Sequence, residues 1–276
     1  MLPNPDPIEE IILSHGTRGM DRIRAAVPAG YCARSARLLL ANRGRVLIGT
    51  GFPVSGSFET DGPIGAIALY RVLDGLGHEP VFGCAPPISQ VLARDFRTRE
   101  VPILSWEATV PVVEAALAEI RPAAIVSIER PGVAADGRYY NMRGRDISDF
   151  LAKFDLFFER CECPTIGIGD GGNEIGMGNV VAELARLPIV PSVTRCDELV
   201  IATVSNWGVY GIIAAMSREL GRDLFEGFDP ADVVRRLVDR GAVDGKTGCA
   251  ECSEDGFPLG VGLEIIGRLR KLISTG

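Results

Sequence analysis

Apolar segments of strand length recur along the chain, and most are followed by a longer segment with a helical pattern. This alternation predicts parallel strands joined by right-handed helical crossovers, with helices on both faces of the sheet. The strands are apolar almost throughout, which is typical of strands that are buried on both faces. The expected strands are Arg45–Pro53, Pro80–Ala85, Pro102–Trp106, Ala123–Glu129, Thr165–Gly169 and Glu198–Thr203.

The segments between and after these strands carry the helical patterns. They are Pro63–Gly75, Ile88–Phe96, Pro111–Ile120, Ile147–Arg160, Glu174–Leu187, Val209–Leu220, Ala231–Arg240 and Val261–Leu272. We therefore expect an α/β fold with three layers and a doubly wound, mainly parallel sheet, preceded by an N-terminal helical extension. No linker-like Ser/Gly or charged run divides the sequence, so residues 1–276 are expected to form a single domain.

The charge balance and the apolar runs exclude some classes of partner. The net charge is −7 and no dense basic stretch is present, which argues against a nucleic-acid partner. No apolar run approaches the length of a membrane span, and the N-terminus lacks the pattern of a signal peptide. The 7 cysteines form no compact disulfide framework, so we expect a cytoplasmic protein. The sequence leaves open whether the chain forms a homo-oligomer.

Acidic side chains follow three of the expected strands. Glu59 and Asp61 come after the first strand, Glu129 ends the Ala123 strand, and Asp170 and Glu174 follow the Thr165 strand. Ligands of open α/β sheets bind outside the carboxyl ends of the strands, so these acids are expected to meet at one edge. Clustered carboxylates repel one another without a counter-charge, and oxygen ligands suit Mg²⁺ or Mn²⁺. An acid in the first turn of a helix is the structural alternative for any single residue.

The glycine-rich segment TIGIGDGGNEIGMGN, residues 165–179, also has the outline of a phosphate-binding turn. Gly167, Gly169 and Gly172 match the spacing G-x-G-x-x-G after a strand, which is a weak signal when it stands alone. Asp170 would repel a pyrophosphate, and no acidic residue lies near position 189 to bind a ribose. A dinucleotide-dependent enzyme is therefore the less favoured interpretation.

Two further motifs have structural alternatives. Residues 245–247, Gly-Lys-Thr, imitate the end of a phosphate loop, but the upstream glycine is one residue too close and no strand precedes them. Cys161 and Cys163, together with Cys249 and Cys252, have enough thiols for a zinc site. Their spacing is weak evidence for one.

A long polar loop follows the Ala123 strand and carries several arginines. It includes Arg130, Asp136 and Arg143. Long loops inside compact domains are often functional, and arginine is the natural bidentate partner of a carboxylate. A surface loop with solvated charges is the alternative.

Three long segments resemble one known family. They are ETDGPIGA at residues 59–66, SIERPGVAADGRYYNMRGRDIS at 127–148 and GIGDGGNEIGMGN at 167–179, and they are similar to the C-terminal-type domain of D-glutamate cyclases. Arg18-Gly19 and Asp255-Gly256 are compatible with a similarity that extends over nearly the full length. In larger members of the family, this domain follows a hydro-lyase-like domain.

The resemblance implies a metal-assisted hydro-lyase that cyclises D-glutamate, a small amino acid, to 5-oxo-D-proline with loss of water. A divalent metal, Mg²⁺ or Mn²⁺, would then act as a Lewis acid. The alternative is a sensor of metal or metabolite on the same fold. The expected roles are metal binding for Glu59, Asp61, Glu129, Asp170 and Glu174, substrate binding for Arg130, Arg143 and Asn173, and proton transfer for Asp136 and Glu174. Which acid binds metal and which transfers a proton stays open.

Overall fold

The structure is a computed structural model that describes residues 6–16 and 18–274, and in this part of the chain six parallel strands form the central sheet. The strands are β1 (Arg45–Thr50), β4 (Glu79–Cys84), β5 (Thr98–Glu100), β6 (Ala124–Ile128), β7 (Thr165–Gly169) and β8 (Glu198–Ile201). Their order across the sheet is β5-β4-β1-β6-β7-β8, and every neighbouring pair is parallel. The chain leaves β1 toward one side and later returns to the other side at β6, so the strand order reverses between these two strands.

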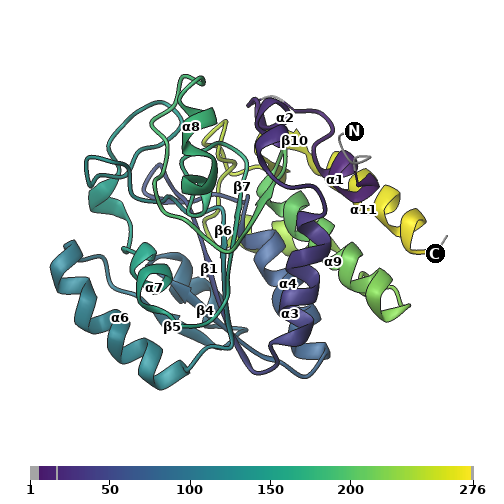
Figure 1. Ribbon diagram of the computed structural model, residues 1–276, viewed down its shortest axis with the longest axis horizontal. Helices are drawn as coiled ribbons and strands as arrows, with labels where there is room; N and C mark the ends of the chain where they lie inside the picture. Colours follow the sequence, from purple (N-terminus) through teal and green to yellow (C-terminus); the bar gives the residue numbers. More distant parts are fainter. Residues whose placement is uncertain (1–5, 17, 275–276) are drawn as a thin grey trace.

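Helices cover both faces of the sheet, which confirms the predicted three-layer α/β fold (Figure 1). One face carries α6 (Trp106–Ile120) and α7 (Asp155–Arg160), and the other carries α3 (Tyr31–Ala41), α4 (Pro63–Gly75) and α9 (Ser205–Leu220). Beyond α9 lie α1 (Pro7–Ile12) and α11 (Leu259–Ser274), which both pack against it. Helix α9 is therefore enclosed, and its residues from Ser205 to Ser217 are all buried.

Short elements complete the fold. The helices are α2 (Met20–Ile23), α5 (Ile88–Leu92), α8 (Val181–Leu184) and α10 (Pro230–Asp239), with 3₁₀ turns at Arg24–Ala26, Ser148–Phe150 and Met177–Val180. Two small hairpins pair β2 (Pro53–Val54) with β3 (Ser57–Phe58), and β9 (Ser253–Glu254) with β10 (Phe257–Pro258). The main buried core draws on residues from Ile8 to Leu269. None of the helices in residues 6–16 and 18–274 is long and apolar enough to cross a membrane.

The predicted strand at Pro102–Trp106 is wrong. The edge strand β5 lies earlier, and α6 begins at Trp106 rather than at Pro111, so that Pro111 lies inside the helix. The Ser105 hydroxyl accepts a hydrogen bond of 3.3 Å from the Ala108 amide and caps this helix. An N-terminal serine cap outweighed the preference of proline for the first turn.

The predicted helix at Glu174–Leu187 is also wrong over its first half. The carbonyl oxygen of Thr194 accepts hydrogen bonds from the amides of Gly176 and Gly178 at 2.9 and 3.0 Å. Gly176 has a φ of 102°, which an α-helix does not allow. The Gly178 amide, which would donate to the Glu174 carbonyl in a helix starting at Glu174, therefore donates to Thr194 instead.

The predicted helix at Ile147–Arg160 is interrupted for a similar reason. Only α7 at its end is α-helical, and Leu151 is extended. Asp155, the first residue of α7, accepts hydrogen bonds from the Val133 amide at 2.9 Å and the Tyr139 hydroxyl at 2.7 Å. These contacts with the preceding loop fix where the helix begins.

Candidate active site

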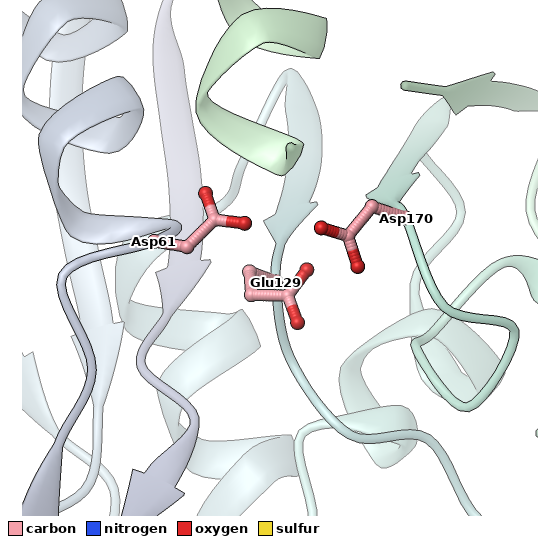
Figure 2. A group of neighbouring side chains, drawn as sticks. All are labelled: Asp61, Glu129 and Asp170. Carbon is pink, nitrogen blue, oxygen red and sulfur yellow. The ribbon is translucent and has the colours of Figure 1, made fainter. Parts of the chain in front are cut away.

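Three carboxylates from separate loops converge at the carboxyl edge of the sheet (Figure 2). Glu129 follows β6 directly, Asp170 follows β7 directly, and Asp61 comes after the hairpin that follows β1. Each offers an oxygen atom, and these oxygens lie within 4.8 Å of one another. All three side chains are buried. The group lies where the strand order reverses, between β1 and β6, which is the usual ligand position in open α/β sheets.

Asp61 is held by the N-terminus of α9. Its Oδ1 accepts hydrogen bonds from the amides of Gly62 and Asn206, both at 2.8 Å, and its Oδ2 accepts one of 2.9 Å from the Ser205 amide. Burial raises the pKa of Asp61 well above its usual range, and the nearby Asp170 carboxylate adds to the rise, whereas the backbone hydrogen bonds oppose it. The helix N-terminus thus fixes one carboxylate of the group.

Glu129 adopts a backbone conformation that is rare for a residue with a side chain. Its φ is 45°, in the left-handed region, and such strained positions cluster at functional sites. Its Oε2 accepts a hydrogen bond of 2.5 Å from the Ser205 hydroxyl. A Cβ atom on Gly62 would lie 2.8 Å from the Cβ of Glu129, so a glycine is needed there. Burial, followed by the charge of Asp170, raises the pKa of Glu129.

Asp170 has one oxygen in an ion pair and one without a hydrogen-bond partner in the described part of the chain. Its Oδ1 pairs with the guanidinium of Arg18, which also pairs with Asp255. Its Oδ2 is buried and unpartnered within residues 6–16 and 18–274. Burial raises the pKa of Asp170, although Arg18 opposes the rise. An unpartnered buried carboxylate oxygen is costly, and a bound cation would satisfy it.

Sequence reasoning gave no role to Arg18 or Asp255. The two residues lie 237 positions apart, and Arg18 lies 152 positions from Asp170. Both stand in the flanking segments that resemble the family, and this was the one signal that marked them. The pKa of Asp255 is raised to about 8, mainly by burial and then by Asp170.

Glu174 explains why the glycine-rich segment is not a phosphate cradle. Its two carboxylate oxygens accept hydrogen bonds from the amides of Gly171 and Gly172, at 2.9 and 2.7 Å. These amides would bind a phosphate in a nucleotide site, and here a side chain of the same loop occupies them. Burial, then the charge of Asp170, raises the pKa of Glu174 to about 7. Glu174 lies beside the three-acid group, and its metal-binding and catalytic roles stay predictions.

Glu59 is buried on the hairpin side of the group. A Cβ atom on Gly245 would lie 1.7 Å from its Oε2, so the backbone at position 245 can pack against this carboxylate only because the residue is glycine. Burial, then the charges of Asp61 and Asp255, raises the pKa of Glu59 well above its usual range. Glu59 adds negative charge to the site, and its role as a ligand stays a prediction.

Asn206 joins three elements around the acids. Its Oδ1 accepts hydrogen bonds from the amides of Gly62 and Gly65 at 2.9 and 2.7 Å, before and within α4. Its Nδ2 donates to Oε2 of Glu254 on the β9 hairpin at 2.8 Å. Asn206 therefore fixes the ends of α4 and α9 relative to that hairpin, and no sequence motif indicated it.

The predicted substrate-binding arginines differ in environment. Arg130 is 1% exposed, and it donates hydrogen bonds to the carbonyls of Thr50 at 2.9 Å and Ala152 at 3.0 Å. Its guanidinium also lies 5.0 Å from the centre of the Phe154 ring. These contacts favour a structural role for Arg130, whereas Arg143 is exposed on the long loop.

Asn173 and Asp136 complete the predicted set. Asn173 is buried, and its Nδ2 donates to the Tyr140 carbonyl at 3.0 Å, while its Oδ1 has no hydrogen-bond partner in the described residues. Asp136 is exposed and accepts hydrogen bonds from the Tyr140 hydroxyl at 2.5 Å and the Arg138 amide at 3.1 Å. Neither belongs to the three-acid group, and their roles stay predictions.

The donor set at the three-acid group fits a hard divalent cation. Carboxylate oxygens suit Mg²⁺ or Mn²⁺, and Asp61, Glu129 and Asp170 bring them within reach of one ion. In the described residues, this is the one group of three or more acidic, histidine or cysteine side chains with such spacing. The structure thus gives no support to the alternative zinc site from the four cysteines.

Comparison with known proteins identifies relatives of this chain. The sequence model of the family described as D-glutamate cyclase-like, C-terminal, matches residues 8–270. The chain is also 38% identical over 210 residues to D-glutamate cyclase, mitochondrial, of Homo sapiens. That match covers 66% of this chain and 34% of the human protein, so the chain matches about a third of the length of that relative. With nearly all its residues matched, the chain belongs to the D-glutamate cyclase-like, C-terminal family.

Proposed function

We propose that this protein is a divalent-metal-dependent lyase that cyclises D-glutamate to 5-oxo-D-proline with loss of water. The observation that carries the proposal is the buried group of Asp61, Glu129 and Asp170, whose oxygens lie within 4.8 Å of one another. The unpartnered Oδ2 of Asp170 in the described structure supports a cation at this place. The family relationship supports the substrate.

Asp61, Glu129 and Asp170 would hold the metal, with Glu59 adding negative charge beside them. A divalent metal bound there supplies Lewis-acid chemistry that makes a carboxylate carbon more electrophilic. The side chains are positioned before any ligand arrives, because Ser205 and the N-terminus of α9 bind Asp61 and Glu129. Such preorganisation lowers the cost of binding a cation.

The reaction requires proton transfer in both directions. The nitrogen of D-glutamate forms a bond to the γ-carboxylate carbon, and one carbon–oxygen bond of that carboxylate breaks. The ammonium group loses two protons overall, and the leaving oxygen takes up two protons to become water. Glu174 lies beside Asp170 and is our proposed proton carrier, and the exposed Asp136 is the second candidate.

Substrate binding would use polar groups that protein contacts leave available. Asn173 has a buried Oδ1 that lacks a partner within the described residues, and an acceptor of this kind suits an ammonium group. Arg143 on the long loop is our proposed partner for the α-carboxylate. Arg130 is already held by the carbonyls of Thr50 and Ala152, and its role in substrate binding stays a prediction that its unpartnered Nε in the described structure leaves open.

The test compares metal binding with product formation. The chelator-treated chain is titrated with Mn²⁺ and Mg²⁺ while thermal unfolding is recorded, and 5-oxoproline is followed by chromatography with L-glutamate as the stereochemical control. Metal at 100 times its Kd is expected to add about 2.7 kcal/mol to the unfolding free energy. Asp170→Asn should lose both effects, and Asp74→Asn, which changes an exposed carboxylate, should keep both.

The outcomes separate the two functions that fit the acidic group. Stabilisation by metal without product from D-glutamate would favour the sensor alternative over the cyclase. Absence of metal stabilisation at millimolar concentrations would refute the metal site itself. Full activity in Asp170→Asn would refute the assignment of this residue as a ligand.

A further inference from the structure

Cys161 and Cys163 lie at the opposite end of β7 from the acidic group. Cys161 directly follows α7, and Cys163 stands two residues before β7, whose far end is followed by Asp170. Both cysteines are half-buried, and the residue between them, Glu162, is exposed. The pair therefore belongs to a separate part of the surface, which the proposed cyclase reaction does not use.

The backbone bends between the two cysteines, so that the Cys161 side chain contacts the backbone of Cys163. The Cys161 Sγ lies 3.4 Å from the carbonyl oxygen of Cys163 and 3.7 Å from that of Phe158. The Cys161 thiol thus contacts the backbone of Cys163, and both cysteines also pack against the buried cluster that contains Ile125 and Phe157. In the described residues, no third side chain joins them in a group that would hold a metal ion.

The pair is open to small molecules from two sides. A cavity of 650 Å³ is lined by both cysteines together with Phe158, Arg195 and Asp197. A second cavity of 430 Å³ touches the same pair and is lined by Arg121 and Arg160. Both volumes fall within the range of about 300–1,000 Å³ that is usual for small-molecule sites. The acids Glu162 and Asp197 also line these cavities, and Arg160 pairs with Glu114, so Arg195 and Arg121 are the side chains that can bind carboxylates of a ligand.

The two thiols differ in reactivity. The interaction between the two side chains lowers the pKa of Cys161, and the same interaction, with burial, raises the pKa of Cys163. The thiolate is the reactive form of cysteine, so Cys161 is the better nucleophile. Cys196 lines the same cavity, but burial raises its pKa to about 12.

We propose that Cys161 and Cys163 form a reversible dithiol–disulfide couple that exchanges with small carboxylate-bearing disulfides of the glutathione type. The Cys161 thiolate attacks one sulfur of the small disulfide, whose sulfur–sulfur bond breaks and releases one thiolate. Cys163 then loses its proton to solvent and attacks the Cys161 sulfur, which forms the internal disulfide and releases the second thiolate. Two electrons pass from the cysteine pair to the small disulfide, which is the oxidant.

The test uses the full chain with Cys249→Ser and Cys252→Ser, because these exposed thiols would also react. The reduced protein is treated with oxidised glutathione at pH 7 and mapped by mass spectrometry after digestion. We expect a Cys161–Cys163 disulfide in this background. Addition of Cys163→Ser should leave one glutathione on Cys161, and addition of Cys161→Ser should slow adduct formation on Cys163 about tenfold.

Two controls make the result specific to the fold. In urea, Cys161 in the Cys163→Ser variant and Cys163 in the Cys161→Ser variant should react at similar rates when mapped by peptide, because the bend that distinguishes the thiols is lost. Arg195→Glu should slow the reaction with oxidised glutathione more than that with the neutral 2-hydroxyethyl disulfide. Equal rates for the two variants in the native protein, or a disulfide to another cysteine, would overturn the couple. An equal effect of Arg195→Glu on both reagents would overturn the carboxylate preference.

Discussion

Replacement of Asn206 by aspartate changes the side-chain amide that links α4, α9 and the β9 hairpin beside the acidic site. The new side chain keeps an oxygen to accept from the Gly62 and Gly65 amides. Its second oxygen replaces the Nδ2 atom that donates to Oε2 of Glu254 at 2.8 Å. A hydrogen bond becomes a contact between two buried carboxylates, with almost no change in volume.

The expected cost follows from these contacts. A hydrogen bond to a charged group contributes about 1.5–3 kcal/mol, and repulsion between two buried carboxylates adds to its loss. We expect Asn206→Asp to lower the unfolding free energy by about 3 kcal/mol at pH 8. The melting temperature should fall by roughly 5–10 °C in a chain of this size.

The cost should depend on pH in a defined direction. Burial already raises the pKa of Glu254 to about 7, and a second carboxylate beside it would raise this pKa further. A group whose pKa is raised on folding contributes stability that is present at low pH and is lost as the pH rises through the folded-state pKa. Near pH 5.5 the two carboxyl groups share a proton, so the destabilisation should shrink.

The assay is urea unfolding followed by circular dichroism at pH 5.5 and pH 8. Adding Glu254→Gln to Asn206→Asp restores a donor opposite the new carboxylate and should recover most of the loss at pH 8. Asn141→Asp is the matched control, since within the described residues only the Oδ1 of Asn141 accepts hydrogen bonds, from the amides of Arg143 and Arg145. A decrease in the unfolding free energy below about 0.5 kcal/mol at pH 8, or no rescue by Glu254→Gln, would refute this account of the Asn206–Glu254 contact.

Three further predictions concern other parts of the chain. Burial raises the pKa of Glu9 from 4.5 to about 7. The unfolding free energy of Glu9→Gln, measured in urea, should therefore increase relative to that of the wild type as the pH rises from 5 to 8, by at most about 3 kcal/mol. Gly178→Ala would place a Cβ atom 2.2 Å from the Val193 carbonyl oxygen and should cost about 3 kcal/mol or more in thermal unfolding. A Cβ atom at Gly267 on α11 would meet no atom of another described element within 4 Å, so Gly267→Ala should gain about 0.5–1 kcal/mol. NAD should give no specific binding in calorimetry, because a carboxylate already occupies the amides of the glycine-rich loop, and an isotherm with micromolar affinity would contradict this.

The sequence by itself determined the layers and the edge of the sheet that carries the acids. Local periodicity distinguishes apolar strands from helices, and β7 and α4 have the bounds that it predicts. The carboxyl ends of parallel strands lie at one edge, so acids that follow the strands, such as Glu129 and Asp170, must approach one another.

Only the tertiary structure decided which of these acids share one position and what holds them. The Glu174 carboxylate accepts hydrogen bonds from amides of its own loop, while Asp170 pairs with Arg18, which lies 152 residues away in the sequence. Thr194 takes the amides of Gly176 and Gly178, which a local pattern assigns to a helix. In each case the conformation depends on which hydrogen-bond partner a group finds in the folded chain, and that partner is often distant in sequence. Periodicity describes only neighbours along the chain, so it cannot predict such a partner.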